Sequence, residues 1–227
     1  ARRRKALDSE HEGLVFGRLD LKTGQLYYVG RLGIRGEGSE SLVVDWRAPA
    51  AAAFYQATAK DPRDVIRRRM IRSAGERVTG VEDDLLDPEA APADMHVVGD
   101  GALLASLGRA TGTGMRDIVA TIQPEQDEAI RAPASGVTIV SGGPGTGKTA
   151  VALHRAAYLL YSDRNRFAGG GILVVGPSGV FVNYIATVLP SLGEDSATLH
   201  SLGSLVLNIN AVRVDPAAVA AVKGSLR

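Results

Sequence analysis

The stretch that decides the fold is Ser141-Gly142-Gly143-Pro144-Gly145-Thr146-Gly147-Lys148-Thr149. From Gly142 to Thr149 it matches the pattern G-x-x-x-x-G-K-[ST] of a phosphate-binding loop. Glycines let the backbone curve around an anion with its N–H groups pointing inward, and the N-terminus of a following helix adds partial positive charge. The alternative is a glycine-rich turn that only joins a strand to a helix.

The segments on either side of this loop predict a strand and a helix. Val137-Thr138-Ile139-Val140 is apolar and mostly β-branched, as in a buried parallel strand. Residues 150–161 have apolar side chains at helical spacing. In this context Lys148 would reach the β- and γ-phosphates of ATP, and Thr149 would hold Mg²⁺, which gives both a catalytic role. The expected cofactor-binding residues of the loop are Gly142, Gly143, Pro144, Gly145, Thr146, Gly147, Lys148, Thr149 and Ala150.

The segments after the loop predict further strands and helices in alternation. Ile172-Leu173-Val174-Val175 reads as a second buried strand, and Pro177-Ser178 opens a helix that ends near Leu189. Residues 197–199 predict a third strand, and residues 201–207 a short helix. The order strand, helix, strand, helix, strand predicts an α/β fold with a doubly wound parallel sheet and right-handed crossovers. A ligand would then lie at the carboxyl ends of the strands, where the loop is.

The composition limits the classes of function. The chain has 227 residues, which suits one large or two small domains, and a formal net charge of +1, so any contact with nucleic acid must be local. It has no cysteine, which excludes disulfides and thiolate metal sites and suits a reducing cytoplasm. No apolar run reaches the ~18 residues of a membrane span, so we expect a cytoplasmic protein without a membrane partner.

The first half of the chain predicts a small β-rich, antiparallel region over residues 13–100, after a charged stretch at 1–12 that we interpret as the end of an N-terminal helical region. Residues 14–21 and 26–34 flank a short glycine-containing turn and predict a hairpin. Residues 42–46 predict another strand. Two further segments, 65–72 and 77–81, predict a second hairpin, and 88–94 is the expected linker. A short helix is expected over 102–110.

Charged residues in this half allow more than one interpretation. Asp45 and Arg47 flank the only tryptophan and could form either a site or a structural ion pair at a strand end. Six arginines lie between Arg63 and Arg77, and five acids follow between Glu82 and Glu89. The arginines could bind nucleic acid, or the basic strand and the acidic stretch could neutralise each other.

The order of motifs in the second half resembles the core of a superfamily 1, UvrD-like helicase. Gln123-Pro124-Glu125-Gln126 is similar to the Q-motif, in which the last glutamine, Gln126 here, would hydrogen-bond the adenine edge. The loop from Gly142 to Thr149 is similar to motif I, and residues 172–178 take the place of motif Ia. Thr198-Leu199-His200-Ser201-Leu202 resembles an element that the family places against single-stranded nucleic acid. By this resemblance Ser178, His200 and Ser201 are candidate nucleic-acid contacts, although His200 could equally be a helix-start or core histidine.

The first half makes the resemblance more specific. The segments Tyr28-Val29-Gly30-Arg31, Val44-Asp45-Trp46-Arg47-Ala48-Pro49, Phe54-Tyr55 and the run from Met115 to Gln123 look like the HelD family, including its actinobacterial HelR branch. The resemblance implies an ATP- and Mg²⁺-dependent hydrolase that binds bacterial RNA polymerase and releases it from nucleic acid. We therefore expect residues 101–227 to be a partial RecA-like P-loop domain (1A).

Departures from the family pattern shape the remaining expectations. Ala150 stands where UvrD-like helicases often have an arginine, and Gly176-Pro177-Ser178 lacks the aromatic residue of motif Ia, so we expect DNA or RNA to bind weakly. After Leu199 the only acid is Asp215, and no Asp-Glu strand or arginine finger follows. We expect a fragment of a larger motor that is inactive alone. The alternatives are a polymerase-binding module without a motor, a UvrD-type DNA helicase fragment, and another P-loop ATPase.

Overall fold

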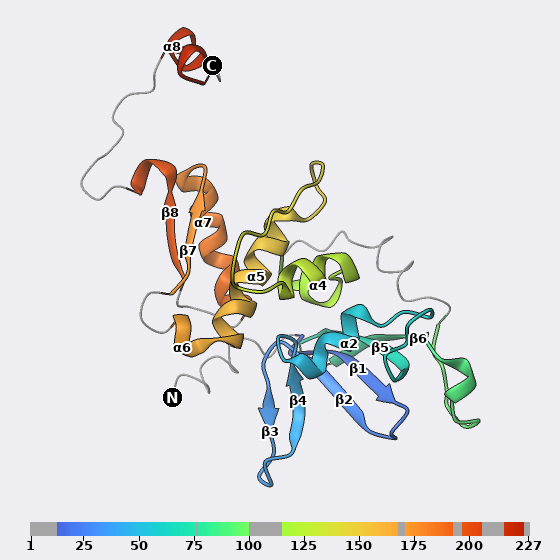
Figure 1. Ribbon diagram of the computed structural model, residues 1–227. Coiled ribbons are helices and arrows are strands. Elements are labelled where there is room, and N and C mark those ends of the chain that lie inside the picture. Colours follow the sequence, from blue (N-terminus) through green and yellow to red (C-terminus); the bar gives the residue numbers. More distant parts are fainter. Residues whose placement is uncertain are drawn as a thin grey trace.

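The chain forms a β-rich half followed by an α/β half, and the two are in contact (Figure 1). The computed structural model describes residues 13–75, 77–99, 115–167, 171–192, 197–205 and 216–224. The predicted helix over 102–110 and the charged stretch at 1–12 lie outside the described residues. Among the described residues, no helix is both long enough and apolar enough to cross a membrane.

The β-rich half is built on one six-stranded sheet with the order β3-β4-β2-β1-β5-β6. Four of the five neighbouring strand pairs are antiparallel, and the fifth, β2 with β4, is parallel. The region is therefore β-rich and mostly antiparallel, although the sequence predicts an antiparallel sheet throughout. The strands are β1 (Val15–Leu21), β2 (Leu26–Gly30), β3 (Ile34–Arg35), β4 (Ser41–Asp45), β5 (Val65–Ala74) and β6 (Arg77–Leu85).

Both predicted hairpins are confirmed, β1 with β2 and β5 with β6. The second hairpin is longer than predicted because the acidic residues belong to strand β6 and lie opposite the arginines of β5. Arg68 faces Asp84 and Arg69 faces Asp83 in the register of the two strands. Their ion pairs are 2.8 Å and 2.6 Å long, and Arg72 forms a further ion pair with Glu82, which lies diagonally across the two strands. The charges of this hairpin therefore neutralise each other, and opposite charges across a strand pair stabilise it.

A short helical segment packs against this sheet. It consists of the 3₁₀ turn η1 (Pro49–Ala51) and α2 (Ala52–Gln56). Gly17 of β1 lies directly under Phe54 of α2, because a Cβ atom at Gly17 would be 2.2 Å from a ring carbon. Arg47, just before the turn, pairs with Asp45 at 2.8 Å and is almost completely buried, so the structural interpretation of this pair is confirmed.

The α/β half contains helices α4 (Pro124–Arg131) and α5 (Lys148–Ser162), which precede a small parallel sheet of two strands, β7 (Leu173–Gly176) and β8 (Thr198–Ser201). Pro124 takes the first position of α4, where its missing N–H costs nothing. Ser178 caps α7 by accepting a hydrogen bond from the N–H of Phe181. The elements are η2 (Pro88–Ala90), η3 (Met115–Ala120), α4 (Pro124–Arg131), α5 (Lys148–Ser162), α6 (Arg164–Phe167), β7 (Leu173–Gly176), α7 (Gly179–Val188), η4 (Leu189–Leu192), β8 (Thr198–Ser201), η5 (Leu202–Ser204) and α8 (Ala217–Gly224).

One predicted strand is absent from this half. Residues 137–140 have no strand assignment, and the side chains of Val137 and Ile139 are 89% and 85% exposed. A strand needs a neighbour to complete its hydrogen bonds, and no described strand pairs with this segment. For the same reason β7 is less buried than predicted, with Leu173 55% exposed. The observed parallel sheet is therefore a partial one of two strands.

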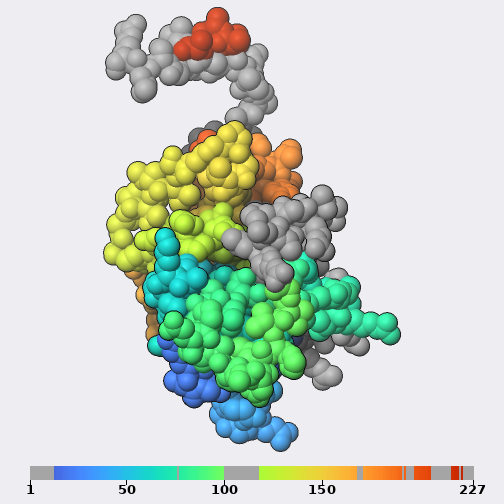
Figure 2. Space-filling model, turned by 90° about the vertical axis from the view of Figure 1, so that its right-hand side faces the viewer, coloured from blue at the N-terminus to red at the C-terminus, as the bar shows by residue number. Residues whose placement is uncertain are grey.

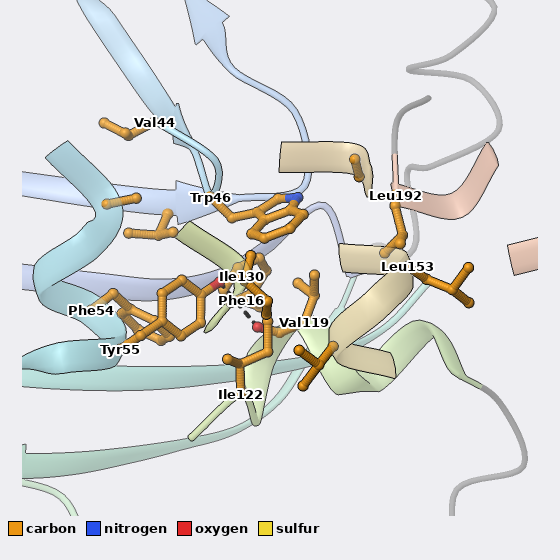
Figure 3. Packing of buried hydrophobic residues seen from close by; sticks show 14 of the residues in the cluster. Phe16, Val44, Trp46, Phe54, Tyr55, Val119, Ile122, Ile130, Leu153 and Leu192 are labelled. Carbon is orange, nitrogen blue, oxygen red and sulfur yellow. Dashed lines mark hydrogen bonds between the residues drawn. The ribbon is translucent and has the colours of Figure 1, made fainter. Parts of the chain in front are cut away.

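A single hydrophobic core runs from the β-rich half into the α/β half. Trp46 lies at its centre, between Phe54 and Tyr55 on one side and Leu153 of α5 on the other (Figure 3). In Figure 2 the cyan and green surface of the β-rich half continues without a gap into the lime and yellow surface of the α/β half. The core buries large apolar side chains from both halves, such as Trp46 of the β-rich half and Leu153 of α5. The two halves therefore stabilise each other.

Candidate nucleotide-binding site

The predicted phosphate-binding loop leads into the N-terminus of α5, and its backbone is curled. Gly145 and Gly147 have φ angles of 76° and 86°, in the left-handed region that glycine adopts without strain. At Gly142 the constraint is space, because a Cβ atom there would be 2.6 Å from the Thr146 hydroxyl oxygen. The glycines of the motif therefore have the physical roles that a loop folded around an anion requires.

Lys148 lies folded over this loop. Its Nζ donates to the carbonyl oxygens of Gly142 and Gly143, at 2.8 Å and 2.6 Å. The hydroxyl of Thr146 closes the loop by donating to the same Gly143 carbonyl at 2.9 Å. Thr149 follows in the first turn of α5 and is half-buried. An ammonium group, a hydroxyl and the unpaired N–H groups of a helix start form a donor set that fits a polyphosphate with Mg²⁺.

The structure brings Gln126 of α4 to this loop. Its Nε2 donates to the carbonyl of Thr146 at 3.4 Å, and its Oε1 accepts from the N–H of Gln123 at 3.1 Å, which completes a capping box. A Cβ atom at Gly147 would be 2.9 Å from Gln126 Nε2, so the contact also depends on this glycine. The Q-motif candidate and motif I are therefore adjacent in space, although both amide atoms of Gln126 are engaged within the protein.

Ala150 has a different position from the other predicted cofactor-binding residues. Its side chain is buried, with 6% exposed. It can therefore contribute only its backbone N–H to a ligand at the helix start.

The candidate nucleic-acid contacts gather at one end of the small parallel sheet, since Gly176 of β7 lies opposite Ser201 of β8. Their polar groups serve local structure. The His200 ring Nδ1 is 3.0 Å from the carbonyl of Ser204, and the hydroxyl of Ser178 caps α7. Within the described part of the chain, no hydrogen bond or ion pair joins Ser178, His200 or Ser201 to the phosphate-binding loop.

A cavity of about 590 Å³ lies apart from the loop, between β5, β6, α2 and the residues that lead into α4. It is partly polar, with Arg68, Asp83 and Asp84 among its lining residues, and apolar elsewhere, with Phe54 and Met70. No residue of the phosphate-binding loop lines it. It is therefore a separate feature from the candidate nucleotide site, although Gln123 and Pro124 of the Q-motif form part of its wall.

Comparison with protein families assigns the two halves. Residues 1–96 match the family described as DNA helicase IV HelD, N-terminal domain, and residues 126–223 match the family described as AAA domain. The chain carries a HelD N-terminal domain followed by an AAA domain. The second match begins at Gln126 and includes the whole loop, so the expected combination of a HelD-like region with a P-loop ATPase region is confirmed. A comparison with curated proteins gave no match.

The HelD N-terminal domain reaches the loop helix through Trp46, which packs edge-on against His154 of α5 with 5.4 Å between ring centres. His154 is fully buried, and its Nδ1 is 2.7 Å from the carbonyl of Ala150. Burial lowers the pKa of His154 to about 4, and the nearby charge of Arg31 acts in the same direction. The imidazole is therefore neutral at physiological pH and belongs to the core rather than to a catalytic site.

Several polar residues of the junction were not predicted as functional. Arg131 and Asp127 stand four positions apart on α4, a spacing that does signal an ion pair, and their distance is 2.8 Å. Gln56 contacts Asp127 across the domain boundary, and Arg155 of α5 contacts the end of α4. No sequence pattern indicates these last two contacts, because the partners are far apart along the chain.

Proposed function

We propose that this chain is the ATP-binding part of a HelD-like motor ATPase, of the superfamily 1 type. The observation that carries the proposal is the loop itself. Its glycines Gly145 and Gly147 are left-handed, it leads directly into the start of α5, and the Lys148 ammonium lies within hydrogen-bonding distance of its Gly142 and Gly143 carbonyls. The match of residues 126–223 to an AAA domain supports the same conclusion.

Each residue of the loop has a distinct role in this proposal. The backbone N–H groups at the start of α5 hold the phosphates, and Lys148 exchanges its two carbonyl contacts for the β- and γ-phosphates. The hydroxyl of Thr149 holds Mg²⁺, which neutralises phosphate charge as it develops during transfer. Gln126 exchanges its contacts with the carbonyl of Thr146 and the N–H of Gln123 for the adenine edge, so that it offers one donor and one acceptor to the base.

The proposed partner is bacterial RNA polymerase, released from nucleic acid in an ATP-dependent manner in the cytoplasm. Support comes from the match of residues 1–96 to the HelD N-terminal domain. The pairing of the β5 arginines with the β6 acids argues for weak binding of DNA or RNA, because guanidinium groups already held by carboxylates gain less from phosphates. A second candidate is a DNA helicase of the UvrD type, which the words "DNA helicase IV" in the matched family favour.

A pull-down with core RNA polymerase, beside a DNA titration at two salt concentrations, separates these candidates. The proposal predicts salt-sensitive retention of polymerase and DNA binding that is weaker. Tight DNA binding with a steep salt slope and no polymerase retained would favour the helicase and refute the polymerase role.

The nucleotide role itself is tested by binding of a fluorescent ATP analogue with and without Mg²⁺. Thr149→Ala should remove most of the Mg²⁺-dependent gain in affinity, while Thr187→Ala, at an exposed threonine of α7, should keep it. If Thr149→Ala and Thr187→Ala respond alike to Mg²⁺, the assignment of Thr149 is wrong.

A further inference from the structure

The Q-motif segment, residues 119–131, is held by the HelD N-terminal domain at three points, although that domain contributes no residue to the nucleotide-binding motifs. The first point lies before the Q-motif. The Tyr55 hydroxyl of α2 donates to the carbonyl of Val119 at 3.0 Å, and both residues are buried (Figure 3). A buried hydroxyl of this kind is costly to leave unpaired, so the bond fixes where the segment enters α4.

The second point lies one residue after Gln126. Asp127 is fully buried and accepts a hydrogen bond from Gln56 Nε2 at 2.6 Å. Burial raises the pKa of Asp127, an effect that Arg131 and the Gln56 hydrogen bond oppose. The other amide atom of Gln56, its Oε1, accepts from Arg63. Gln56 is therefore held from both sides and defines the position of the Asp127 carboxylate.

The third point is at the end of α4. The Arg131 guanidinium donates to the carbonyl of Trp46 at 2.7 Å and to the carbonyls of Arg47 and Ala48 at 3.2 Å and 3.4 Å. Its Nε donates to Asp127 at 2.8 Å. Asp127 and Arg131 of α4 thus form one largely buried network with the N-terminal domain.

A fourth set of bonds connects this network to the loop helix. Arg155 of α5 donates to the carbonyls of Ala129, Ile130 and Ala132, at 3.1 Å, 3.3 Å and 2.6 Å. These are the carbonyl oxygens that the end of a helix leaves unpaired. The end of α4 is therefore held by the loop helix on one side and by the N-terminal domain on the other.

We infer that Gln56 of the HelD N-terminal domain is a positioning residue for base recognition, acting through Asp127 to set the rotation of α4 and so the place of Gln126. Neighbouring residues on a helix point about 100° apart, so fixing the Asp127 side chain fixes the direction of Gln126. Gln126 is the residue of α4 whose side chain contacts the loop, at the Thr146 carbonyl.

Through Gln56 the N-terminal domain acts on the nucleotide site without contributing a residue to it. Coupling between two binding sites is reciprocal. A partner whose binding displaces α2 would therefore change the preference for ATP over GTP, and bound ATP would change the affinity for that partner. This inference rests on the proposed nucleotide site.

The experiment compares the affinities for ATP–Mg²⁺ and GTP–Mg²⁺ in the 227-residue chain and in four variants. These are Gln56→Ala, Gln126→Ala, the double variant, and Gln25→Ala as a matched control in the exposed β1–β2 turn. Gln56→Ala should reduce the ATP preference by about fivefold, in the same direction as Gln126→Ala. In the Gln126→Ala background, Gln56→Ala should change the preference no further. Gln25→Ala should match the unmodified chain.

The ratio of the two affinities is the informative quantity, since a merely structural loss would weaken ATP and GTP equally. The inference would be overturned if Gln56→Ala left the ratio of the two affinities unchanged, whether or not both nucleotides bound more weakly. It would also be overturned if the effects of the two substitutions on that ratio simply added in the double variant. Failure of the proposed function looks different. In that case neither nucleotide binds, or Lys148→Ala binds both as well as the unmodified chain does.

Discussion

The buried histidine of the loop helix predicts a loss of stability in mild acid. His154 has an ordinary pKa of 6.5 when unfolded and a pKa of about 4 in the folded chain, because burial disfavours the imidazolium form. The unfolded chain therefore binds the proton more readily. Stability is fully present above about pH 6.5 and falls by roughly 1.4 kcal/mol per pH unit until about pH 4. At about pH 5 the contribution of this one residue is a loss of roughly 2 kcal/mol.

The assay is urea unfolding at about pH 8 and about pH 5, for the unmodified chain and for His154→Phe. The phenyl ring keeps the packing on Trp46 but cannot titrate, so the difference in free energy of unfolding between the two pH values should shrink by roughly 2 kcal/mol. Thr187→Ala, at an exposed threonine without a titratable group, should leave that difference as it is. If His154→Phe keeps the full pH dependence, then His154 is not buried as a neutral imidazole and the shared core around it is wrongly described.

Three further predictions concern the sheet and the loop. Asp83→Asn should lower the free energy of unfolding by roughly 3 kcal/mol, measured in urea, because it leaves the guanidinium groups of Arg67 and Arg69 without their shared carboxylate; Asp61→Ala, at an exposed pair, should cost less than about 1 kcal/mol. Gly17→Ala should destabilise by roughly 1–3 kcal/mol in the same assay, since its Cβ would meet the Phe54 ring at 2.2 Å; a change within error would mean that α2 can move away. The chain should show no steady ATP hydrolysis above that of Lys148→Ala in a phosphate-release assay, and robust turnover abolished by that substitution would refute the expectation of an inactive fragment.

Much of the fold is predictable because the local signals are strong. The two hairpins, the helix after the loop and the Ser178 cap each follow from short-range patterns, and the structure has all of them. The strand expected at 137–140 does not form. Its β-branched residues favour an extended backbone, but a strand also needs a neighbouring strand to hydrogen-bond with, and composition does not provide one. The acids from Glu82 to Asp84 looked like a stretch after the hairpin, yet they form its second strand, and only the register reveals this.

In the candidate site, too, the features set by short stretches of sequence are predictable and the contacts between distant residues are not. The loop residues are predictable because the motif is contiguous and each position has a local physical role. The proximity of Gln126 to the loop is a prediction from family resemblance, and the structure places the two in contact. The contact between Gln56 and Asp127 was beyond prediction, because the residues are 71 positions apart, Gln56 belongs to no motif, and Asp127 lies just after the Q-motif residues 123–126. Such long-range polar pairs depend on how the domains pack, which a single sequence does not state.

Calorimetric titration of the chain with ATP–Mg²⁺, beside Lys148→Ala, tests the central claim most directly. The geometry predicts saturable 1:1 binding to the unmodified chain, since Lys148 can move from the carbonyls of Gly142 and Gly143 to the phosphates. Loss of this charge-assisted contact should weaken binding by roughly 1.5–3 kcal/mol in Lys148→Ala. No heat of binding in the unmodified, folded chain, or equal affinities in the two proteins, would contradict the claim that this loop holds a nucleotide.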